Sequence, residues 1–466
     1  MTNKDSSTGP DIIVLEFNEL CPNLMDQMIG QDKLPNFKRL RDGSVAMITD
    51  AEEASPQLEP WIQWPTIHSG LKADEHQIFD LGESRKLKQS CLAKIISDQG
   101  IPVGILGSMN TNYRDLDGFF IPDPWDHEGK AEPAELQPFY QTVAKQVQDS
   151  SSEEGISKKD LMQFGWFMIR HGMRSSTIRA GLTQLMAERI DKGVQWRRSL
   201  ILERLQFDLF RFLKKKYQTR FNTFFCNSTA HFQHYYWRNM EPEIFSVPPG
   251  ENDHPSLRTA IEEGYVQMDG LVGEFMREFP NSRMILLTAI SQEPWKETTK
   301  CTYRPRNFYD FLHFVGVSPD EVDVKPVMAE EFHLICRSPD QRQEIGEKIL
   351  QAMVNGQPAM KARLEEDGLF CGCAVNDVSA RQATVDHPIG GKLNFDDMFH
   401  MVHSMRSGRH QPHGLFWVQS ETPRLVPDPV PLVDVTPTIL GLFDIPAPPR
   451  MSGEFISIDA TQCAVN

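Results

Sequence analysis

The sequence predicts an α/β fold built around a large, mostly parallel sheet, and three observations lead to this prediction. The chain has 466 residues, of which 40% are hydrophobic and 24% charged, and these values are ordinary for a globular protein. Several short runs are apolar throughout, as strands buried on both faces are. Segments with one-sided apolar stripes at helical spacing lie between most of these runs, which is typical of a parallel sheet covered by helices.

Five apolar runs are the predicted strands. Each is short and ends in small or polar residues, which favours a buried strand followed by a loop. The runs cover residues 12–17, 101–110, 221–229, 284–289 and 415–419. In such sheets, chemistry collects at the carboxyl ends of the strands. Asn18 and Glu19 after the first run, and Asn110 at the end of the second, are therefore candidates for a common site.

Helices are predicted between the strands. The segment LPNFKRLRDGS predicts a short helix that ends near Gly43. Ile261, Tyr265, Met268 and Phe275 form a one-sided apolar stripe, which predicts a helix packed on the sheet.

One insertion interrupts the core of the chain. Residues 1–10 are predicted to be disordered, residues 11–131 and 217–466 to form the core α/β domain, and residues 132–216 to form a helical insertion. The insertion is a candidate cap over the site, and the alternative is that its helices pack on the sheet as ordinary core helices. A smaller α+β unit is predicted near residues 320–375.

The net charge limits which classes of partner the chain can have, and the cysteine content indicates its cellular compartment. The formal net charge of −16 argues against a nucleic-acid or anionic-membrane partner, because both need clustered Lys and Arg. An anionic substrate would need a local positive centre. No apolar run reaches membrane-spanning length, and the polar N-terminal stretch does not resemble a signal peptide. The eight scattered cysteines are expected to be structural or free thiols, so we expect a cytoplasmic, reducing location.

Several segments occur in a familiar order. They are IIVLEFNEL, LPNFKRLRDGS, WIQWPTIHSGLKADEHQIFDLG, STAHFQHYYW, MILLTAISQEPW, SGRHQPHGLFWV and VPLVDVTPTILGLFDIPAPPRMSGEFI. Together they resemble the alkaline phosphatase superfamily, nearest the type I phosphodiesterase/nucleotide pyrophosphatase branch, over most of the chain outside the insertion. The resemblance implies a sandwich with a large central sheet. It also implies hydrolysis of phosphate or sulfate esters by two metal ions and a Thr, Ser or Cys nucleophile.

The residues that this two-metal site needs are mostly replaced. Asn18 and Glu19 stand where the family has a metal-binding Asp followed by Gly. Pro60 stands at the nucleophile position, Ala230 replaces a ligand Asp, and residues 291–293 replace an Asp–His pair. Two-metal catalysis needs both ions, so we do not expect that mechanism in this chain.

Two histidines keep their family positions, because His234 and His410 match histidine ligands of the superfamily. With His231 they predict a three-histidine site for one divalent metal, zinc or manganese. His231 and His234 would share one face of a helix at their three-residue spacing. The alternative is that both pack as polar residues among the neighbouring aromatic side chains.

Glu59 is the candidate catalytic carboxylate. It lies beside the expected nucleophile position, and a carboxylate can act as a general base or as a covalent nucleophile. Asn18 and Glu19 belong to the same candidate catalytic group. The alternative for Glu59 is an exposed carboxylate that caps a helix.

Three further residues are predicted to bind the anionic group of a substrate. Arg304 and Arg306 could supply positive charge, and Gln292 lies in the segment that replaces the Asp–His pair. The alternative for the arginines is surface ion pairing, and the alternative for Gln292 is that it caps a loop before Pro294.

The sequence therefore supports two functions. The first is a hydrolase or transferase acting on a phosphate or sulfate ester of a small molecule or glycan-linked intermediate, with an atypical one-metal or metal-free site. The second is a catalytically degenerate homologue that binds such a ligand, or a partner, without hydrolysis.

Overall fold

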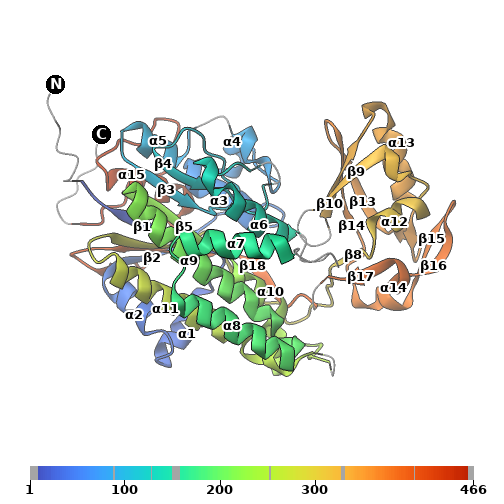
Figure 1. The fold of residues 1–466 in the computed structure, drawn as a ribbon, viewed down its shortest axis with the longest axis horizontal. Coiled ribbons are helices and arrows are strands. Elements are labelled where there is room, and N and C mark those ends of the chain that lie inside the picture. The colour runs from blue at the N-terminus through green and yellow to red at the C-terminus, as the bar shows by residue number, and fades with distance from the viewer. Residues whose placement is uncertain are drawn as a thin grey trace.

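The structure is a computed structural model, and it describes residues 9–87, 90–126, 129–148, 158–250, 253–326, 331–402 and 405–459. Figure 1 shows a large body of helices and strands, with a smaller unit on one side of it. The prediction that residues 1–10 are disordered concerns mainly residues 1–8, which lie outside the described residues.

A single central sheet forms the framework of the large body, and this confirms the predicted α/β class. In the described part of the chain it has nine strands, in the order β20-β2-β19-β6-β1-β5-β3-β4, with β21 paired to β2. Most neighbouring strands are parallel, whereas β19 runs antiparallel to β2 and β6. The strands are β1 (Ile12–Phe17), β2 (Ser44–Asp50), β3 (Val103–Leu106), β4 (Gly118–Ile121), β5 (Phe221–Cys226), β6 (Arg283–Thr288), β19 (His413–Gln419), β20 (Arg424–Leu425) and β21 (Val430–Pro431).

The predicted strands all appear, with shifts at their ends. The third predicted run, 221–229, extends too far, because β5 ends at Cys226 and helix α10 begins at Ser228. Strand β2 was not predicted, although its mostly buried run Val45–Thr49 has strand-like composition. It lies between β19 and two short edge strands, so its position in the sheet depends on residues far along the chain.

Helices cover both faces of the sheet, and alternate residues of β1 explain why. Ile13, Leu15 and Phe17 enter one apolar core, and Ile12 and Val14 enter the other. The first core packs against α1 (Pro22–Gly30), α2 (Pro35–Asp42), α6 (Gln137–Gln148), α9 (Arg198–Tyr217), α10 (Ser228–Met240) and α11 (Ala260–Glu278). The second packs against α3 (Pro60–Ser69), α5 (Leu92–Asp98) and α15 (Val435–Gly441).

The segment 132–216 is helical. Its helices are α6, α7 (Lys158–Arg170), α8 (Ser175–Ile190) and α9. Helix α9 contacts β3, β4 and β5, so this helix packs on the sheet in the way the alternative prediction described. The division of the chain into domains, and a capping role for the remaining helices, stay predictions. Among the described helices, none is both long and apolar enough to cross a membrane.

The smaller unit has its own apolar core, which runs from Cys301 to Met405 and so extends beyond the predicted 320–375. Two four-stranded sheets, with the orders β13-β14-β10-β9 and β12-β11-β15-β16, form its framework in the described residues. Its elements are β8 (Tyr303–Pro305), α12 (Phe308–Phe314), β9 (Val322–Pro326), β10 (Glu331–Cys336), α13 (Arg342–Leu350), β11 (Met353–Val354), β12 (Gln357–Pro358), β13 (Met360–Leu364), β14 (Gly368–Cys373), β15 (Thr384–His387), β16 (Gly391–Asn394), α14 (Phe395–Met398) and β17 (Phe399–Met401).

Candidate active site

Four chain segments meet at the carboxyl edge of the central sheet. Asn18 and Glu19 follow β1, helix α10 follows β5, and the short strand β7 (Ser291–Pro294) follows β6. Strand β18 (Gly408–Gln411) pairs antiparallel with β7, with His410 opposite Gln292. An isolated parallel bridge joins Glu19 to Ser291. Residues almost 400 positions apart in the sequence are therefore brought together by strand pairing.

The carboxylate of Glu19 is the centre of this arrangement. Its Oε2 lies 3.1 Å from Nε2 of His234 and 3.3 Å from Nε2 of His410. The side-chain amide of Gln292 donates to the same oxygen, and Nδ2 of Asn18 donates to Oε1 at 2.8 Å. The Glu19 side chain is only 3% exposed, whereas those of His234 and His410 are 16% and 13% exposed. Solvent therefore reaches the histidines but hardly the carboxylate.

The backbone of Glu19 is in the left-handed region, with φ of +57°. Few residues other than Gly adopt this conformation, and it clusters at functional sites. Nε2 of Gln233 donates to the Glu19 carbonyl at 2.6 Å, and the Tyr265 hydroxyl in turn donates to Oε1 of Gln233 at 2.7 Å.

Both histidines direct Nε2 to Glu19, because their other ring nitrogens have partners elsewhere. Nδ1 of His234 lies 3.4 Å from the carbonyl oxygen of Gly408. Nδ1 of His410 lies 3.1 Å from the carbonyl oxygen of Leu58 and 3.2 Å from Oε2 of Glu59. Such contacts fix the tautomer and orientation of histidines that bind metals.

Charges at the site are strongly coupled. Burial alone would raise the pKa of Glu19, but the nearby His410 and His234 outweigh it and hold that pKa well below its usual range. Burial would lower the pKa of His410, yet Glu19 and then Glu59 raise it to about 10. Burial lowers the pKa of His234, and Glu19 offsets this only in part. At neutral pH the site thus holds a carboxylate, an imidazolium and a neutral imidazole.

The three groups form a donor set of the kind that holds a metal ion. One ligand atom each from Glu19, His234 and His410 lies within 4.8 Å of the other two. The two Nε2 atoms are 3.3 Å apart, close to the two nitrogen–oxygen distances. Tetrahedral zinc, with bonds of about 2.0–2.1 Å to nitrogen and oxygen, separates neighbouring ligand atoms by about 3.3–3.4 Å. The spacing therefore fits one ion with these three atoms as ligands.

The predicted third histidine ligand lies apart from this set. The ring of His231 is tilted against that of Tyr235, with centroids 4.9 Å apart, and lies near Tyr236 and Phe232. Burial, with a smaller effect of His234, lowers its pKa to about 4. The structure therefore brings together Glu19, His234 and His410 rather than the three histidines, and a metal role for His231 stays a prediction.

The predicted catalytic residues Glu59 and Asn18 both touch this set. Glu59 precedes helix α3, but its side chain forms no capping hydrogen bond to the helix, and it contacts His410 instead. Asn18 donates from Nδ2 to Oδ1 of Asn227 as well as to Glu19, and its Oδ1 accepts from Nε1 of Trp64. Asn18 thus fixes the carboxylate of Glu19 from behind.

The two predicted arginines lie in the smaller unit. Arg304 is buried in β8 and stacks over Phe308, with its guanidinium carbon 5.2 Å from the ring centroid, and Nη2 lies 3.3 Å from the Glu331 carbonyl oxygen. Arg306 is exposed and donates from Nε to the carbonyl oxygen of Asp396. Both arginines engage groups of their own unit, and a role in substrate binding stays a prediction. Gln292, by contrast, lies at the centre of the site.

The expected nucleophile position holds a side chain without a nucleophilic atom, because it is Pro60. Pro60 opens helix α3, and the nearest hydroxyl along the chain, that of buried Thr66, lies six residues farther along. Oγ1 of Thr66 lies 3.1 Å from Nε2 of His76 and 3.3 Å from the carbonyl oxygen of Ile62. This hydroxyl is therefore part of the packing between α3 and α4 (Ala73–His76).

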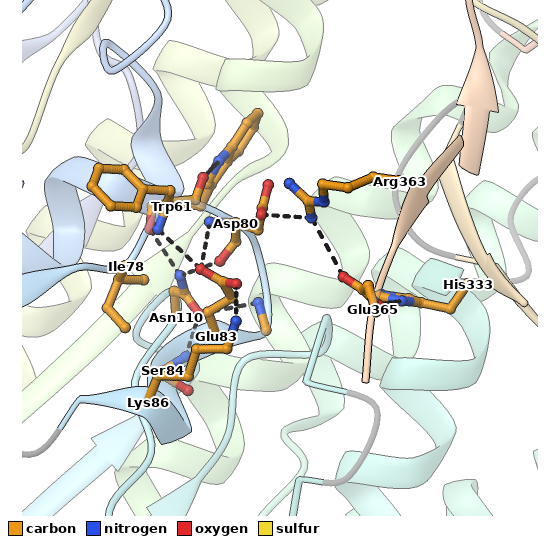
Figure 2. A network of polar contacts seen from close by, with 12 residues as sticks. Trp61, Ile78, Asp80, Glu83, Ser84, Lys86, Asn110, His333, Arg363 and Glu365 are labelled. Carbon is orange, nitrogen blue, oxygen red and sulfur yellow. Dashed lines mark hydrogen bonds and ion pairs between the residues drawn. The ribbon is translucent and has the colours of Figure 1, made fainter. Parts of the chain in front are cut away.

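Asn110, which also follows a strand, holds a loop in place (Figure 2). Its Oδ1 accepts hydrogen bonds from the amides of Gly82 and Ser84, and its Nδ2 donates to the carbonyl oxygens of Trp61 and Asp80. All of its side-chain hydrogen-bonding capacity in the plane is used, so its role is structural. The sequence placed Asn110 at the correct edge but could not distinguish this role from a catalytic one.

The same network reaches the smaller unit. Nη2 of Arg363, on β13, lies 2.8 Å from Oδ2 of Asp80 and 3.4 Å from Oε1 of Glu365. Oε2 of Glu365 in turn lies 2.9 Å from Nδ1 of His333 (Figure 2). A chain of charged groups therefore links the loop after α4 to the sheet of the smaller unit.

Comparisons with known proteins give similarity in fold alone. No protein-family model and no curated protein sequence matches the chain. Among solved structures, murine ectonucleotide pyrophosphatase/phosphodiesterase 5 is 9% identical with a TM-score of 0.41, over 95% of this chain and 97% of that chain. An inactive variant of the murine protein in complex with AMP is 10% identical (TM-score 0.40; 96% and 97% covered). The human counterpart is also 10% identical (TM-score 0.40; 95% and 97% covered).

Proposed function

We propose that Glu19, His234 and His410 bind one divalent metal ion, zinc or manganese. The observation that supports this most directly is the triangle of donor atoms, whose edges of 3.1, 3.3 and 3.3 Å fit the ligand spacing around tetrahedral zinc. The contacts of the two Nδ1 atoms add to the argument, because they leave both Nε2 atoms for the ion.

On this metal site we propose a hydrolase or transferase that acts on a phosphate or sulfate ester of a small molecule or glycan-linked intermediate. The sequence resemblance to the alkaline phosphatase superfamily supports the ester class. The negative charge of the whole chain requires a local positive centre for an anionic ester, and the proposed ion would be such a centre. A bound divalent ion polarises an ester oxygen and offsets the charge that develops in the transition state.

Residues of the chain have distinct roles in this proposal. Asn18 and Gln292 hold the carboxylate of Glu19, and Glu59 orients His410. The side chain of Glu59 is 28% exposed, far more than that of Glu19, so water reaches it. Glu59 accepts a proton of the attacking water as the water oxygen bonds to the phosphorus or sulfur. The bond from that atom to the leaving oxygen breaks, and the leaving oxygen departs with the electron pair and takes a proton from solvent. No hydroxyl takes part as a nucleophile, in keeping with Pro60 and the engaged Thr66.

Metal titration tests the proposed ion. The purified chain is stripped with a chelator, and zinc or manganese is added while bound metal is measured by elemental analysis and unfolding by heat. We expect one ion per chain and stabilisation by about 2.7 kcal/mol at a hundredfold excess over Kd. Glu19→Gln, His234→Ala and His410→Ala should each lose this stabilisation. A chain that binds no stoichiometric metal would contradict the proposed site.

Two histidine variants serve as matched controls. His231→Ala removes a ring from the same helix as His234, three residues away. It therefore distinguishes a metal site made of Glu19, His234 and His410 from one made of the three histidines. His413→Ala removes a partly exposed ring that faces Asp50 at 3.6 Å. Both should retain metal binding, and loss of binding in His231→Ala alone would favour the three-histidine set.

Turnover of activated esters tests the reaction. p-Nitrophenyl phosphate, its diester and p-nitrocatechol sulfate separate monoester, diester and sulfate activity. Product that appears only with metal, and disappears in His234→Ala, supports hydrolysis. A metal-bound chain that turns over none of these probes or other phosphate and sulfate esters would refute it.

A second function is favoured by one observation. Glu19 and His410 neutralise each other, and Gln292 completes the contacts of the carboxylate, so the set is satisfied without an ion. The corresponding proposal is a degenerate homologue that binds an anionic ligand without hydrolysis. It predicts ligand-induced stabilisation without metal and without product.

We also propose a cytoplasmic location, which suits the free thiols of the seven described cysteines.

A further inference from the structure

Helices α7 and α8 expose an unusual number of large apolar side chains. Half of the eighteen exposed large hydrophobic residues in the described chain lie on these two helices, so the exposure is concentrated on them and is not a general property of the surface. We name this patch the α7–α8 surface, and its members are Leu161, Met162, Trp166, Ile169, Ile178, Leu182, Leu185, Met186 and Ile190. Figure 1 shows both helices on the side of the molecule turned to the viewer.

The spacing of these residues places them on one face of each helix. On α7, Trp166 follows Met162 by four residues and Ile169 follows Trp166 by three. On α8, Leu182 and Leu185 continue the same pattern. Their exposed fractions, 70% for Met162 and 61% for Trp166, show that no strand or helix of the described residues covers this face.

Helix α8 turns polar side chains towards the protein and apolar side chains towards solvent, the reverse of the usual arrangement. Nε2 of buried Gln184 donates to Oε1 of Glu188 at 2.9 Å and to the carbonyl oxygen of Val194 at 2.8 Å. Buried Glu188 accepts from Nε of Arg198 at 2.9 Å. A helix that faces water normally buries its apolar side. The opposite arrangement is stable when a partner covers the outer face.

Charge around the surface is positive, although the chain as a whole is acidic. Residues 158–192 contain seven Lys and Arg but three Asp and Glu, an excess of four positive charges. Two of these acids are engaged, since Glu188 pairs with Arg198 and Asp191 lies 3.1 Å from His254. One of the basic residues is engaged as well, since Arg174 pairs with Asp208 and Glu274. The exposed basic residues of the segment are Lys159, Arg170, Arg179, Arg189 and Lys192.

We propose that the α7–α8 surface docks on an anionic lipid bilayer, with its apolar side chains in the headgroup layer and its basic side chains on lipid phosphates. Interfacial helices combine apolar residues, including Trp, with Lys and Arg in this way. The guanidinium carbon of Arg170 lies 4.5 Å from the Trp166 ring centroid, so a basic and an aromatic group already adjoin. The total charge of −16 argues against an anionic membrane for the chain as a whole, but residues 158–192 supply a local cluster of Lys and Arg, and salt screens the charges that lie beyond about 8 Å.

The charges favour a bilayer over a second copy of the chain. In a two-fold dimer through this face, the basic residues of one copy would face those of the other, which is unfavourable. An anionic bilayer presents the complementary sign over its whole area. Docking would be independent of the proposed metal site, because none of these residues touches Glu19, His234 or His410 in the contacts described above.

Flotation of the full chain with lipid vesicles tests the proposal. Vesicles of phosphatidylcholine alone are compared with vesicles that hold one part phosphatidylglycerol to two parts phosphatidylcholine, at about 0.15 M salt. The wild-type chain should bind the anionic vesicles, bind the neutral ones at least about tenfold more weakly, and dissociate from the former as salt rises. Binding to neither, or to both equally, would overturn the proposal.

Matched variants distinguish vesicle binding through the α7–α8 surface from nonspecific adsorption. The double variant Arg179→Glu/Arg189→Glu should weaken binding to anionic vesicles at least about tenfold, since each basic residue contributes about fivefold. Leu185→Glu/Met186→Glu should weaken it by at least as much, because two apolar side chains leave the headgroup layer and two negative charges face the lipid phosphates. Leu425→Glu changes a residue that is 74% exposed on β20 and should leave binding unchanged. Equal binding by all variants would refute the assigned surface.

The same variants also show whether a second copy of the chain, instead of a bilayer, binds the α7–α8 surface. A wild-type chain that is dimeric by light scattering, does not float with vesicles, and becomes monomeric in Leu185→Glu/Met186→Glu would identify a second copy and overturn the lipid proposal. Circular dichroism and zinc-dependent stabilisation serve as controls for folding. Both should match the wild type, because the changed side chains lie on the surface.

Discussion

The buried pair of Glu16 and His68 makes the pH dependence of stability predictable. Glu16 lies near the carboxyl end of β1, where Oε2 accepts from Oγ of Ser108 at 2.6 Å and Oε1 lies 3.3 Å from Nε2 of His68. Burial raises the pKa of Glu16 to about 8, and burial lowers the pKa of His68 to about 3. Both groups are therefore neutral in the folded protein at pH 7.

The sign and size of the effect follow from these values. A carboxyl group with a raised pKa contributes fully to stability below its ordinary pKa of 4.5, and the contribution is lost as pH rises through 8. Between pH 4.5 and 7 the unfolded chain loses the proton that the folded chain keeps, at about 1.4 kcal/mol per pH unit. The cost at pH 7 is therefore about 3 kcal/mol. His68 acts in the opposite sense, because its contribution is lost as pH falls from 6.5 towards 3.

Replacing Glu16 by Gln tests this reasoning. The amide has the shape of the protonated acid, so it can accept from Ser108 and donate to Nε2 of His68, but it has no proton to lose. We expect the free energy of unfolding of Glu16→Gln, relative to wild type, to rise by about 3 kcal/mol between pH 5 and pH 8. Urea denaturation at several pH values measures it, and the effect of His68 cancels because both proteins contain it.

A surface substitution provides the control for Glu16→Gln. Glu366→Gln changes an exposed carboxylate of the smaller unit and should show no such rise. If the difference between Glu16→Gln and wild type stays constant from pH 5 to pH 8, Glu16 is not held neutral and the reasoning fails.

Four other predictions concern the site and the packing. With metal saturating, Glu59→Gln should lower turnover by about 10²–10⁴-fold, while metal affinity, measured by titration, falls only about 10–100-fold. Asn110→Ala removes four hydrogen bonds and should lower the free energy of unfolding in urea by about 2–4 kcal/mol. A decrease below about 1 kcal/mol would contradict the conclusion that Asn110 holds the loop in place. Arg363→Ala should change stability by less than about 1 kcal/mol, because its ion pair with Asp80 is partly exposed; a larger loss in thermal unfolding would mean that the link in Figure 2 holds the smaller unit in place. Phe210→Ala opens the aromatic core around Phe224 and should cost about 3–5 kcal/mol by denaturant, with retention of wild-type stability as the contrary result.

The sequence predicted the sheet well because its signal is local. A strand buried on both faces must be apolar at successive positions, and this is visible in runs such as 12–17 without any knowledge of the fold. The short edge strands and β2 were harder, since what makes them strands is pairing with segments far along the chain. The third strand was extended too far because the residues after Cys226 continue the chain directly into a helix.

The composition of the site depended on geometry that the sequence does not contain. His231 and His234 appeared equivalent at three-residue spacing. Side chains three residues apart on a helix nevertheless point about 60° apart, so one can face the site while the other lies among aromatic rings. Glu19 was recognised as a candidate residue at a strand end, but its position between two histidines was not.

The sequence by itself determined the α/β class, the candidate residues at the strand ends and the acidic balance of the chain, because these depend on local pattern and composition. Only the tertiary structure decided which residues meet. The pairing of β7 with β18 places His410 opposite Gln292 and beside Glu19, and no local pattern encodes a contact over that separation. The tertiary structure likewise decided that the apolar stripe of α8 faces outwards. The same residue spacing occurs in a helix whose apolar face packs on the core and in a helix whose apolar face is exposed.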